Sequence, residues 1–322
     1  MRRRSFLQVA AVTAAPSVLA QGAYPNRPIR FVIPFPPGGT SDIFVRTLIP
    51  KMSEVLGQNL VVDYRAGAAG TIGLDAVAKA APDGYTIGLG SPGGLVAVPH
   101  MLTTKVPYSS ERDFTFLALL ARVPSALVTS NSSGYNSVKE VIDRARAAPG
   151  TLHYGHPGQG TLVHLVAELF KREAKLDITP VPFKGGAAAA QATIGNQVPF
   201  TWIDVSAGWN QISGGLLKTL AVTGARRSPV LPNVPTLAES GLPNAVMEAD
   251  YGVLAPAGLP QDVQARISAA LTAAMEAPAV REAYQKVGAT MVASGPREYR
   301  DAVLADHQKW GAFIREQKIT VE

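Results

Sequence analysis

The sequence predicts a globular α/β protein of one or two domains, built around a largely parallel sheet. Two observations support this fold class. The chain has 322 residues, of which 47% are hydrophobic and 17% charged, so it contains enough apolar side chains for a sizeable core. From residue 28 onward, short β-branched runs alternate with longer segments of helical periodicity, which is the pattern of consecutive βα units.

The strand-like runs are bounded by Gly, Pro, Asn or Asp, and they cover residues 29–34, 59–64, 85–91, 124–130, 151–157, 178–183, 199–204 and 217–224. Helices are predicted between them over residues 41–56, 70–81, 137–147, 161–173 and 186–194. Ser137 opens the third of these helices and Glu140 follows three residues later, which is a capping box. The last third of the chain predicts two long amphipathic helices, at residues 260–288 and 296–318.

Composition excludes several classes of function. The chain has no cysteine, so disulfides, thiolate nucleophiles, zinc ribbons and iron–sulfur clusters are all excluded. The formal net charge is +6, and three of the arginines lie within the first four residues. No lysine and arginine run interleaved with aromatic residues occurs, so we expect no nucleic-acid partner.

Residues 1–20 predict an export signal. They combine a basic start, an Ala/Val-rich middle and small residues at Val18 and Ala20, so cleavage is expected before Gln21. This segment is too short and too weakly apolar for a membrane span. Residues 3–8 resemble the twin-arginine consensus, and an Arg-rich Sec signal is the alternative. Either route places the mature protein in the periplasm.

The turn after the first strand is a candidate anion site. It reads "PFPPGGTSD" over residues 34–42 and leads directly into a helix. The first N–H groups of a helix have no internal partner, so a turn that ends there can hold a carboxylate or phosphate. The candidate residues in this turn are Phe35, Pro37, Gly38, Gly39, Thr40, Ser41 and Asp42.

The segment "HYGHPGQGTLVHLVAELF", residues 153–170, repeats this order of features: a strand, a glycine turn, a hydroxyl cap and a helix. Gly158, Gly160 and Thr161 again leave N–H groups free at a helix N-terminus. Neither turn matches the P-loop or the dinucleotide fingerprint. If the two turns belong to two sheets that face each other, they can hold one ligand from both sides.

Three histidines raise the possibility of a metal site. His153, His156 and His164 lie close together, and Glu168 follows His164 by four residues. A second pair of ligands is missing, so the favoured interpretation is that His164 caps or packs on its helix and His156 lines a pocket. No metal or other cofactor is therefore predicted.

Asp204 and the serines are the remaining candidates for polar chemistry. Asp204 ends a predicted strand, so its carboxylate either meets a ligand amine or hydroxyl or caps the following helix. A serine nucleophile is not predicted, because no G-x-S-x-G occurs. Trp202, Trp209 and Tyr251 are expected in the core rather than at a binding surface.

The chain resembles the Bug family over about residues 24–320. The segments that carry this resemblance follow one another in the family's order: "YPNRPIRFVIPFPPGGTSD", "VVDYRAGAAGTIG", "DGYTIGLGS", "YGHPGQGTLVHLVAELF", "PFKGGAAAAQATIGNQVPF", "KTLAVTGARRSPVLPNVPTLAESGLP", "YGVLAPAGLP" and "HQKWGAFIRE". Members of this family are the extracytoplasmic solute-binding proteins of tripartite tricarboxylate transporters.

The resemblance implies a type II-like, Venus-flytrap binding protein with two lobes, each a mostly parallel sheet flanked by helices. Lobe 1 is expected at residues 24–123 and 229–322 and lobe 2 at residues 124–228, with hinges near residues 122–124 and 223–229. In the family, the loop at 35–42 and the loop at 155–161 hold the ligand carboxylate from opposite sides. The chain departs from the family at His156 and at the "SPGG" of residues 91–94, where the distal part of the ligand is expected.

The expected function is therefore capture of a small carboxylate, such as a di- or tricarboxylate, an aromatic acid or an amino acid, by a monomer that delivers it to membrane permease subunits. Backbone amides and the hydroxyls of Thr40, Ser41 and Thr161 are expected to hold the carboxylate, with Ser91 and Asp204 as selectivity candidates. Two alternatives stay open at this point: a cofactor-free cleft enzyme, a hydrolase or isomerase that acts through His156, Asp204 and Ser91, and delivery of the ligand to a sensor kinase.

Overall fold

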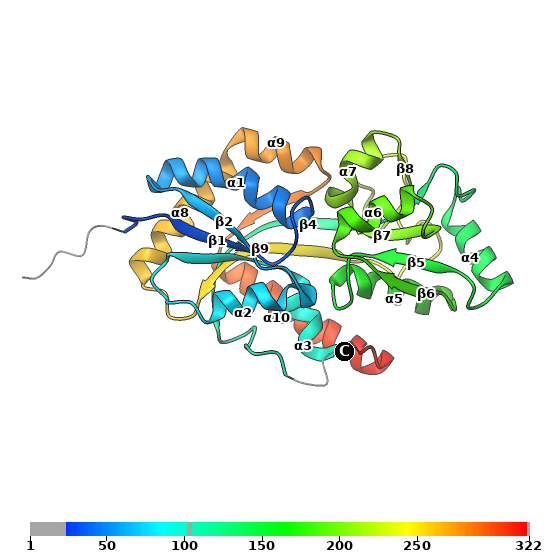
Figure 1. Cartoon of the computed structure of the whole chain (residues 1–322), viewed down its shortest axis with the longest axis horizontal. Coiled ribbons are helices and arrows are strands. Elements are labelled where there is room, and N and C mark those ends of the chain that lie inside the picture. Colours follow the sequence, from blue (N-terminus) through cyan, green and yellow to red (C-terminus); the bar gives the residue numbers. More distant parts are fainter. Residues whose placement is uncertain (1–23, 102–104, 321–322) are drawn as a thin grey trace, which may run out of the picture.

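The computed structural model describes residues 24–101 and 105–320. The predicted export signal lies outside these residues. The predicted α/β class is confirmed, with helices packed around strands (Figure 1). In the stretches that the structure describes, no helix combines the length and the hydropathy that a membrane crossing requires.

One group of strands forms the sheet of what we call the first lobe. Strand β1 runs parallel to both β2 and β3, β9 is antiparallel to β3 and to the first half of β4, and β10 pairs with the other edge of β4. The bounds of these strands are β1 Ile29–Ile33, β2 Leu60–Tyr64, β3 Thr86–Gly90, β4 Phe114–Ser130, β9 Glu248–Pro256 and β10 Thr290–Ser294. The helices of this lobe are α1 Thr40–Leu56, α2 Thr71–Ala78, α3 Val98–Met101, α8 Gln261–Glu276, α9 Pro278–Lys286 and α10 Pro296–Gln317, with short helical segments η1 Ala68–Gly70 and η2 Gly93–Ala97.

The second lobe is built on the other half of β4. Here β7 and β8 pair antiparallel with β4, and β5 lies parallel between β7 and β6. The bounds of these strands are β5 His153–His156, β6 Thr179–Pro182, β7 Phe200–Asp204 and β8 Leu217–Val222. The helices are α4 Val138–Ala147, α5 Leu162–Ala174, α6 Gly186–Ile194 and α7 Val205–Ser213.

Strand β4 passes from one lobe to the other without a break. Its pairing with β9 ends at Pro124, opposite Glu248, and its pairing with β7 begins at Ser125, opposite Asp204. The chain returns beside this crossing, where the Thr223 N–H donates to the Ser125 carbonyl and the Met247 N–H donates to the Thr223 carbonyl. The lobes are therefore joined by adjacent extended segments. The exact division at residues 123/124 and 228/229 stays a prediction.

Three features of the secondary structure differ from the sequence-based expectation. Strands β9 and β10 and the first ten residues of β4 were not predicted, and the helix expected over residues 260–288 is two helices that meet at Pro278. The proline occupies the first turn of α9, where its missing N–H costs no hydrogen bond. The capping box is confirmed in part, since the Ser137 hydroxyl accepts from the Glu140 N–H at 3.1 Å.

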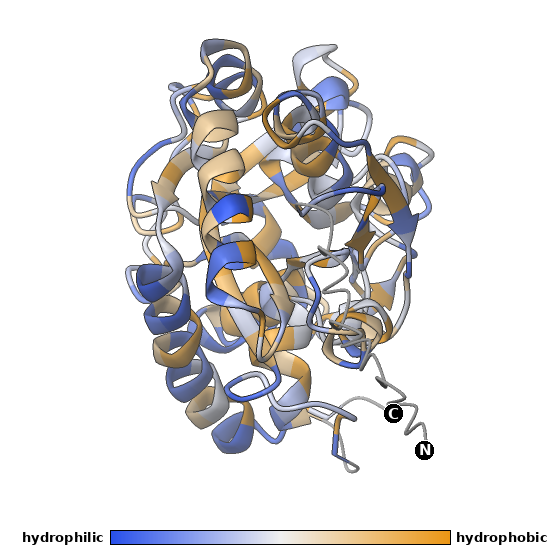
Figure 2. Cartoon of the chain, turned by 90° about the vertical axis from the view of Figure 1, so that its left-hand side faces the viewer, coloured by the Kyte–Doolittle hydropathy of each residue, from blue (hydrophilic) through white to orange (hydrophobic). Residues whose placement is uncertain are grey.

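The core lies between the sheets and the helices that cover them. Figure 2 shows hydrophobic strands behind helices whose outward turns are hydrophilic. Trp202 on β7 and Tyr154 on β5 are fully buried in the second lobe, and Phe44 on α1 stacks on Tyr284 in the first at 4.3 Å between ring centroids. Each lobe thus has a packed scaffold that holds its loops in place.

Candidate functional site

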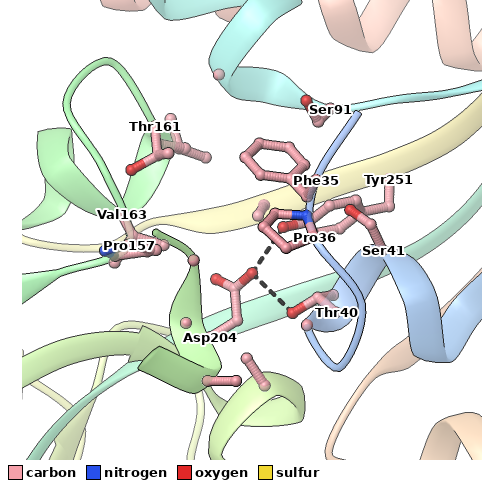
Figure 3. A pocket seen from close by; sticks show the side chains of 18 of the residues that line it. Phe35, Pro36, Thr40, Ser41, Ser91, Pro157, Thr161, Val163, Asp204 and Tyr251 are labelled. Carbon is pink, nitrogen blue, oxygen red and sulfur yellow. Dashed lines mark hydrogen bonds between the residues drawn. The ribbon is translucent and has the colours of Figure 1, made fainter. Parts of the chain in front are cut away.

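A cavity of about 60 Å³ lies between the two lobes (Figure 3). Both lobes supply its walls, at the ends of β1, β3, β5 and β7 and on one face of β9. The lining residues are Phe35, Pro36, Pro37, Gly39, Thr40, Ser41, Ser91, Pro92, Gly93, Pro157, Thr161, Leu162, Val163, Lys184, Gly185, Gly186, Ala187, Asp204, Ala207, Ala249 and Tyr251.

The loop after β1 directs the start of α1 into this cavity. Gly38 takes a positive φ of 85°, which only glycine adopts freely, and its N–H donates to Asp42 Oδ2 at 2.9 Å. Gly39 is the N-cap and no side chain caps this end of the helix. The N–H groups of Thr40 and Ser41 therefore have no carbonyl one turn before them and are available to a ligand.

Asp42 supports this loop from behind and does not line the cavity. Its Oδ1 accepts from Arg46 Nε at 2.8 Å and from the Tyr64 hydroxyl at 2.5 Å. Burial acts to raise the pKa of Asp42, but the hydrogen bonds from Tyr64, Gly38 and Arg46 outweigh it and hold that pKa below its usual value. The carboxylate thus stays ionised and holds the turn.

The loop after β5 directs α5 into the cavity from the second lobe. The Thr161 hydroxyl donates to the Gly158 carbonyl at 2.7 Å and accepts from the His164 N–H at 3.2 Å, so the helix cap occupies it. The N–H groups of Leu162 and Val163 follow this cap, and both residues line the cavity. They are the counterparts of the free N–H groups at the start of α1.

A third helix, α6, also begins at the cavity. Gly185 is its N-cap with φ of 95°, no side chain caps it, and Gly186 and Ala187 line the cavity. Helices α1, α5 and α6 have 17, 13 and 9 residues, so each carries partial positive charge at its N-terminus. Their convergence makes the cavity favourable for an anion.

Asp204 accepts hydrogen bonds from side chains of both lobes. Its Oδ2 accepts from Tyr251 at 2.6 Å and from Thr40 at 3.1 Å (Figure 3). Its Oδ1 accepts from Ser125 at 3.3 Å. Thr40 also contacts the Ser206 hydroxyl at 2.8 Å. The sequence left two roles open for Asp204, contact with a ligand and capping of the next helix. Asp204 is the N-cap residue of α7, but its side chain makes no cap hydrogen bond. Burial raises its pKa, against the effect of these three donors.

Ser91 presents an unused hydroxyl to the cavity. It is 1% exposed, it lines the cavity, and its Oγ has no hydrogen-bond partner among the described residues. A buried hydroxyl without a hydrogen-bond partner costs free energy. A ligand that accepts a hydrogen bond from Ser91 Oγ therefore removes this cost when it binds.

The structure places His156 behind the second loop, outside the lining of the cavity. Its ring is fully buried and stacks on His164 with centroids 4.7 Å apart. Burial, and for His156 also the neighbouring His164, lowers the pKa of His156 to about 3, and burial lowers that of His164 to about 4. His153 is exposed. Over the described residues, no group of three or more His, Asp or Glu side chains could hold a metal ion.

The predicted site residues therefore fall into two sets. Those in the cavity wall are Phe35, Pro37, Gly39, Thr40, Ser41, Ser91, Thr161 and Asp204. Those that shape the loops from outside it are Gly38, Asp42, His156, Gly158 and Gly160. Gly160 approaches the other lobe so closely that a Cβ would lie 2.7 Å from Val98 Cγ2.

Sequence reasoning missed two polar residues of the wall. Tyr251 was expected in the core; it is 7% exposed, yet it lines the cavity and donates to Asp204. Lys184 lies in "PFKGGA", a strand followed by glycines and a helix, so the signal that revealed the first two turns was present here too. The end of β6 could have been recognised as a third turn of the same kind.

A larger second cavity, which we call the outer chamber, adjoins the first. Its volume is about 530 Å³. Both cavities share the lining residues Phe35, Pro36, Pro157, Thr161, Lys184 and Gly185. The rest of its wall comes from Ala66, Gly67, Ala68, Ala69, Val98, Gly158, Gln159, Pro182 and Phe183.

Comparison with known sequences gives a consistent result. A model of the tripartite tricarboxylate transporter family receptor matches residues 44–319. Protein BugT of Bordetella pertussis is 34% identical over 311 residues, covering 97% of this chain and 94% of BugT. A protein of Pseudomonas sp. (strain P51), named for the tcbD-tcbE intergenic region, is 36% identical over 99% of this chain and 95% of its own length.

Solved structures match nearly the whole chain. The periplasmic binding protein BugD has a TM-score of 0.88 at 28% identity, covering 93% of this chain and 100% of BugD. MatC from Rhodopseudomonas palustris, with bound malate, has a TM-score of 0.84 at 30% identity, covering 90% of this chain and 99% of MatC. R. palustris Rpa4515, with adipate, has a TM-score of 0.85 at 32% identity, covering 91% of this chain and 97% of Rpa4515.

Proposed function

This chain belongs to the tripartite tricarboxylate transporter receptor family, and from that premise we propose that it captures a small organic acid between its lobes by the acid's carboxylate. The resemblance to Bug proteins seen in the sequence is thereby confirmed. The family is one of binding proteins and not of enzymes, so the cleft-enzyme alternative is set aside.

The observation that supports this proposal is the convergence of free backbone N–H groups on the cavity between the lobes. The starts of α1 and α5 face each other across it, and α6 adds a third N-terminus. Among the described residues that line it, the charged side chains are Asp204, which accepts from hydroxyl donors, and Lys184 at the junction with the outer chamber. An anion is therefore held by N–H groups and by the Ser91 hydroxyl.

Closure of the two lobes around the ligand is the step that links binding to transport. In a cleft protein, the ligand binds the closed arrangement of the lobes more tightly than the open one, so binding shifts the population toward closure. We propose that the closed receptor then delivers the acid to membrane permease subunits, and that residues 1–20 direct export to the periplasm. Malate and adipate, which are bound in the relatives MatC and Rpa4515, are the first candidates.

A thermal-shift experiment tests the carboxylate. The mature protein is mixed with malate, with adipate, and with the diamide of each as a matched control. A ligand that binds only the folded state raises the melting temperature, by the equivalent of about 2.7 kcal/mol at a concentration of 100 Kd. We expect the acids to raise it and the amides to leave it unchanged. Equal shifts for acid and amide, or no shift by any acid with protein shown by mass spectrometry to be ligand-free, contradict the proposal.

A further inference from the structure

We propose that His100 on α3 and His307 on α10 form an acid-sensitive contact that regulates ligand affinity, so that the receptor binds its acid more weakly once these histidines take up protons. The inference rests on the proposed function, because it concerns the regulation of the same cavity. Neither histidine is among the described residues that line the two cavities. The effect therefore has to pass through the helix that carries His100.

The two rings and one arginine form a row of hydrogen bonds. His100 Nε2 lies 3.1 Å from His307 Nδ1, and Arg315 Nη1 lies 3.4 Å from His100 Nδ1. A guanidinium group only donates, so His100 Nδ1 accepts, and His100 Nε2 carries the hydrogen that is donated to His307 Nδ1. This row uses both rings in their neutral form. A second proton on either ring turns its accepting nitrogen into a donor and breaks the row.

Close packing makes this contact sensitive to charge. Helix α3 lies beside α10 (Figure 1), and the centroids of the two imidazole rings are 4.2 Å apart. A Cβ at Gly311 would lie 2.5 Å from His100 Cε1, so the ring of His100 lies directly on the backbone of α10. Charged rings at this separation repel each other, and Arg315 adds a third positive charge. We expect a shift of α3 away from α10 to relieve this repulsion.

The surroundings of the pair determine when it takes up protons. Burial, His307 and Arg315 all lower the pKa of His100. Burial and Arg315 lower the pKa of His307, although the carboxylate of Glu111 acts to raise it. Histidine ordinarily titrates near pH 6.5, so both rings are neutral at pH 7.5 and take up protons in acid. The contact is therefore present at neutral pH and is lost as the pH falls.

Helix α3 connects the pair to the cavity. It continues η2, whose first residue, Gly93, lines the inner cavity. Val98 opens α3 and reaches the second lobe, since a Cβ at Gly160 would lie 2.7 Å from Val98 Cγ2. The segment from Gly93 to His100 is thus part of the surface on which the second lobe closes. A shift of α3 disturbs this surface and weakens the closed arrangement that holds the ligand.

The first test uses the wild-type protein. If protonation of the pair weakens binding, bound ligand has to resist protonation of the pair by the same factor. The ring resonances of His100 and His307 are therefore titrated by NMR between pH 8 and pH 5, with and without saturating adipate. We expect adipate to move the titration midpoints of both rings lower by about half a pH unit. Unchanged midpoints in protein that binds adipate would overturn the inference.

The second test is calorimetry with adipate at pH 7.5 and pH 5.5. The double variant His100→Gln with His307→Asn replaces both rings by amides, which donate and accept hydrogen bonds but do not titrate. On acidification the wild type should lose about fourfold more affinity than this variant. Burial raises the pKa of Asp306 to about 6, so Asp306 titrates in the same range, as adipate itself does. Both are common to the two proteins, so the difference reports the histidine pair.

His153→Asn is the matched control, because it replaces an exposed histidine by an amide. It should lose as much affinity on acidification as the wild type does. Equal losses in the wild type and the double variant, with the variant shown by circular dichroism to be folded, would overturn the inference and leave the carboxylate proposal intact. If the double variant does not fold, the NMR titration of the wild type decides. Absence of adipate and malate binding at pH 7.5 would instead overturn the proposed function, and this inference with it.

Discussion

At the scale of single residues, some of the buried polar side chains support the loops of the cavity from behind and do not line it. His156 and His164 stack beneath the second loop, where the Gly160 N–H approaches His164 Nδ1 at 3.4 Å and the Gly158 N–H approaches His156 Nδ1 at 3.3 Å. Both rings accept from backbone donors of the loop. They therefore have to stay neutral to support it, since a protonated ring has no acceptor.

This histidine pair predicts a pH dependence of stability. Unfolded histidine titrates near pH 6.5, whereas burial lowers the pKa of His164 to about 4 in the folded protein. Below pH 6.5 the unfolded state binds more protons, so stability falls as the pH decreases from 7 toward 4. For His164 the loss between pH 7 and pH 4.5 is about 2 kcal/mol.

The check is urea unfolding at pH 7 and at pH 4.5 for the wild type and for His164→Phe, which keeps an aromatic ring in the stack. We expect the variant to lose less stability on acidification than the wild type. His153→Phe, at an exposed position, is the control and should behave as the wild type does. Identical acid losses in His164→Phe and the wild type would contradict this account.

At the scale of elements, one local design is used three times. A short strand ends in a glycine-containing turn, and the helix that follows begins at the cavity, as at α1, α5 and α6. Parallel strands place their carboxyl ends on one edge of a sheet, which brings such turns together. Within the second lobe, β5 and β6 are parallel neighbours, so the turns before α5 and α6 lie side by side.

At the start of α5, a proline substitution can remove one backbone N–H donor, that of Leu162. Leu162 is the first helical residue after the Thr161 cap, and Thr161 is extended with ψ of 156°, which suits a residue that precedes proline. Leu162→Pro removes the N–H and Leu162→Ala retains it, and both lose the leucine side chain. If this N–H donates to the carboxylate, Leu162→Pro should bind adipate more weakly than Leu162→Ala by about 1.5–3 kcal/mol in calorimetry. Equal affinities of the two variants would remove this N–H from the site.

At the scale of the whole molecule, the lobes contact each other through small residues and hydroxyls. A Cβ at Gly93 would lie 3.2 Å from the Gly160 carbonyl oxygen, so the lobes approach through backbone there. Thr40 of the first lobe bonds to Asp204 and Ser206 of the second. These polar contacts exist only when the lobes are closed, so they bias the equilibrium between open and closed arrangements.

Thr40→Val tests this bias. The substitution keeps the shape of the side chain and removes the hydroxyl that crosses between the lobes, so we expect a more open ligand-free protein and adipate affinity weaker by about 1 kcal/mol or more. Small-angle scattering of the free protein should show a larger radius of gyration. Thr47→Val on the same helix removes a bond that stays within the first lobe, to the Ile43 carbonyl, and serves as the control. An unchanged radius and affinity in Thr40→Val would show that these contacts do not control closure.

Much of the fold was readable from local pattern. Periodicity and capping residues located α1, α4, α5, α6 and strands such as β1 and β7 close to their observed bounds. The first half of β4 and all of β9 and β10 were missed. These strands belong to the sheet of the first lobe, and partners far away in the sequence define them: Phe114 pairs opposite Pro256 and Thr290 opposite Arg122. Long-range pairing of this kind leaves no local signal.

The sequence by itself determined the two glycine turns, the free N–H groups that follow them and the family of the chain, because backbone conformation at Gly, Pro and helix caps is a local property. Only the tertiary structure decided how side chains divide between cavity and support. Closure of the lobes brings Thr40 and Tyr251 onto Asp204 and leaves Ser91 without a partner, and it places His156 behind its loop. The direction in which a side chain points depends on neighbours that are distant in the sequence, 164 residues for Thr40 and Asp204 and 47 for Tyr251 and Asp204, and these come together only when both lobes have folded.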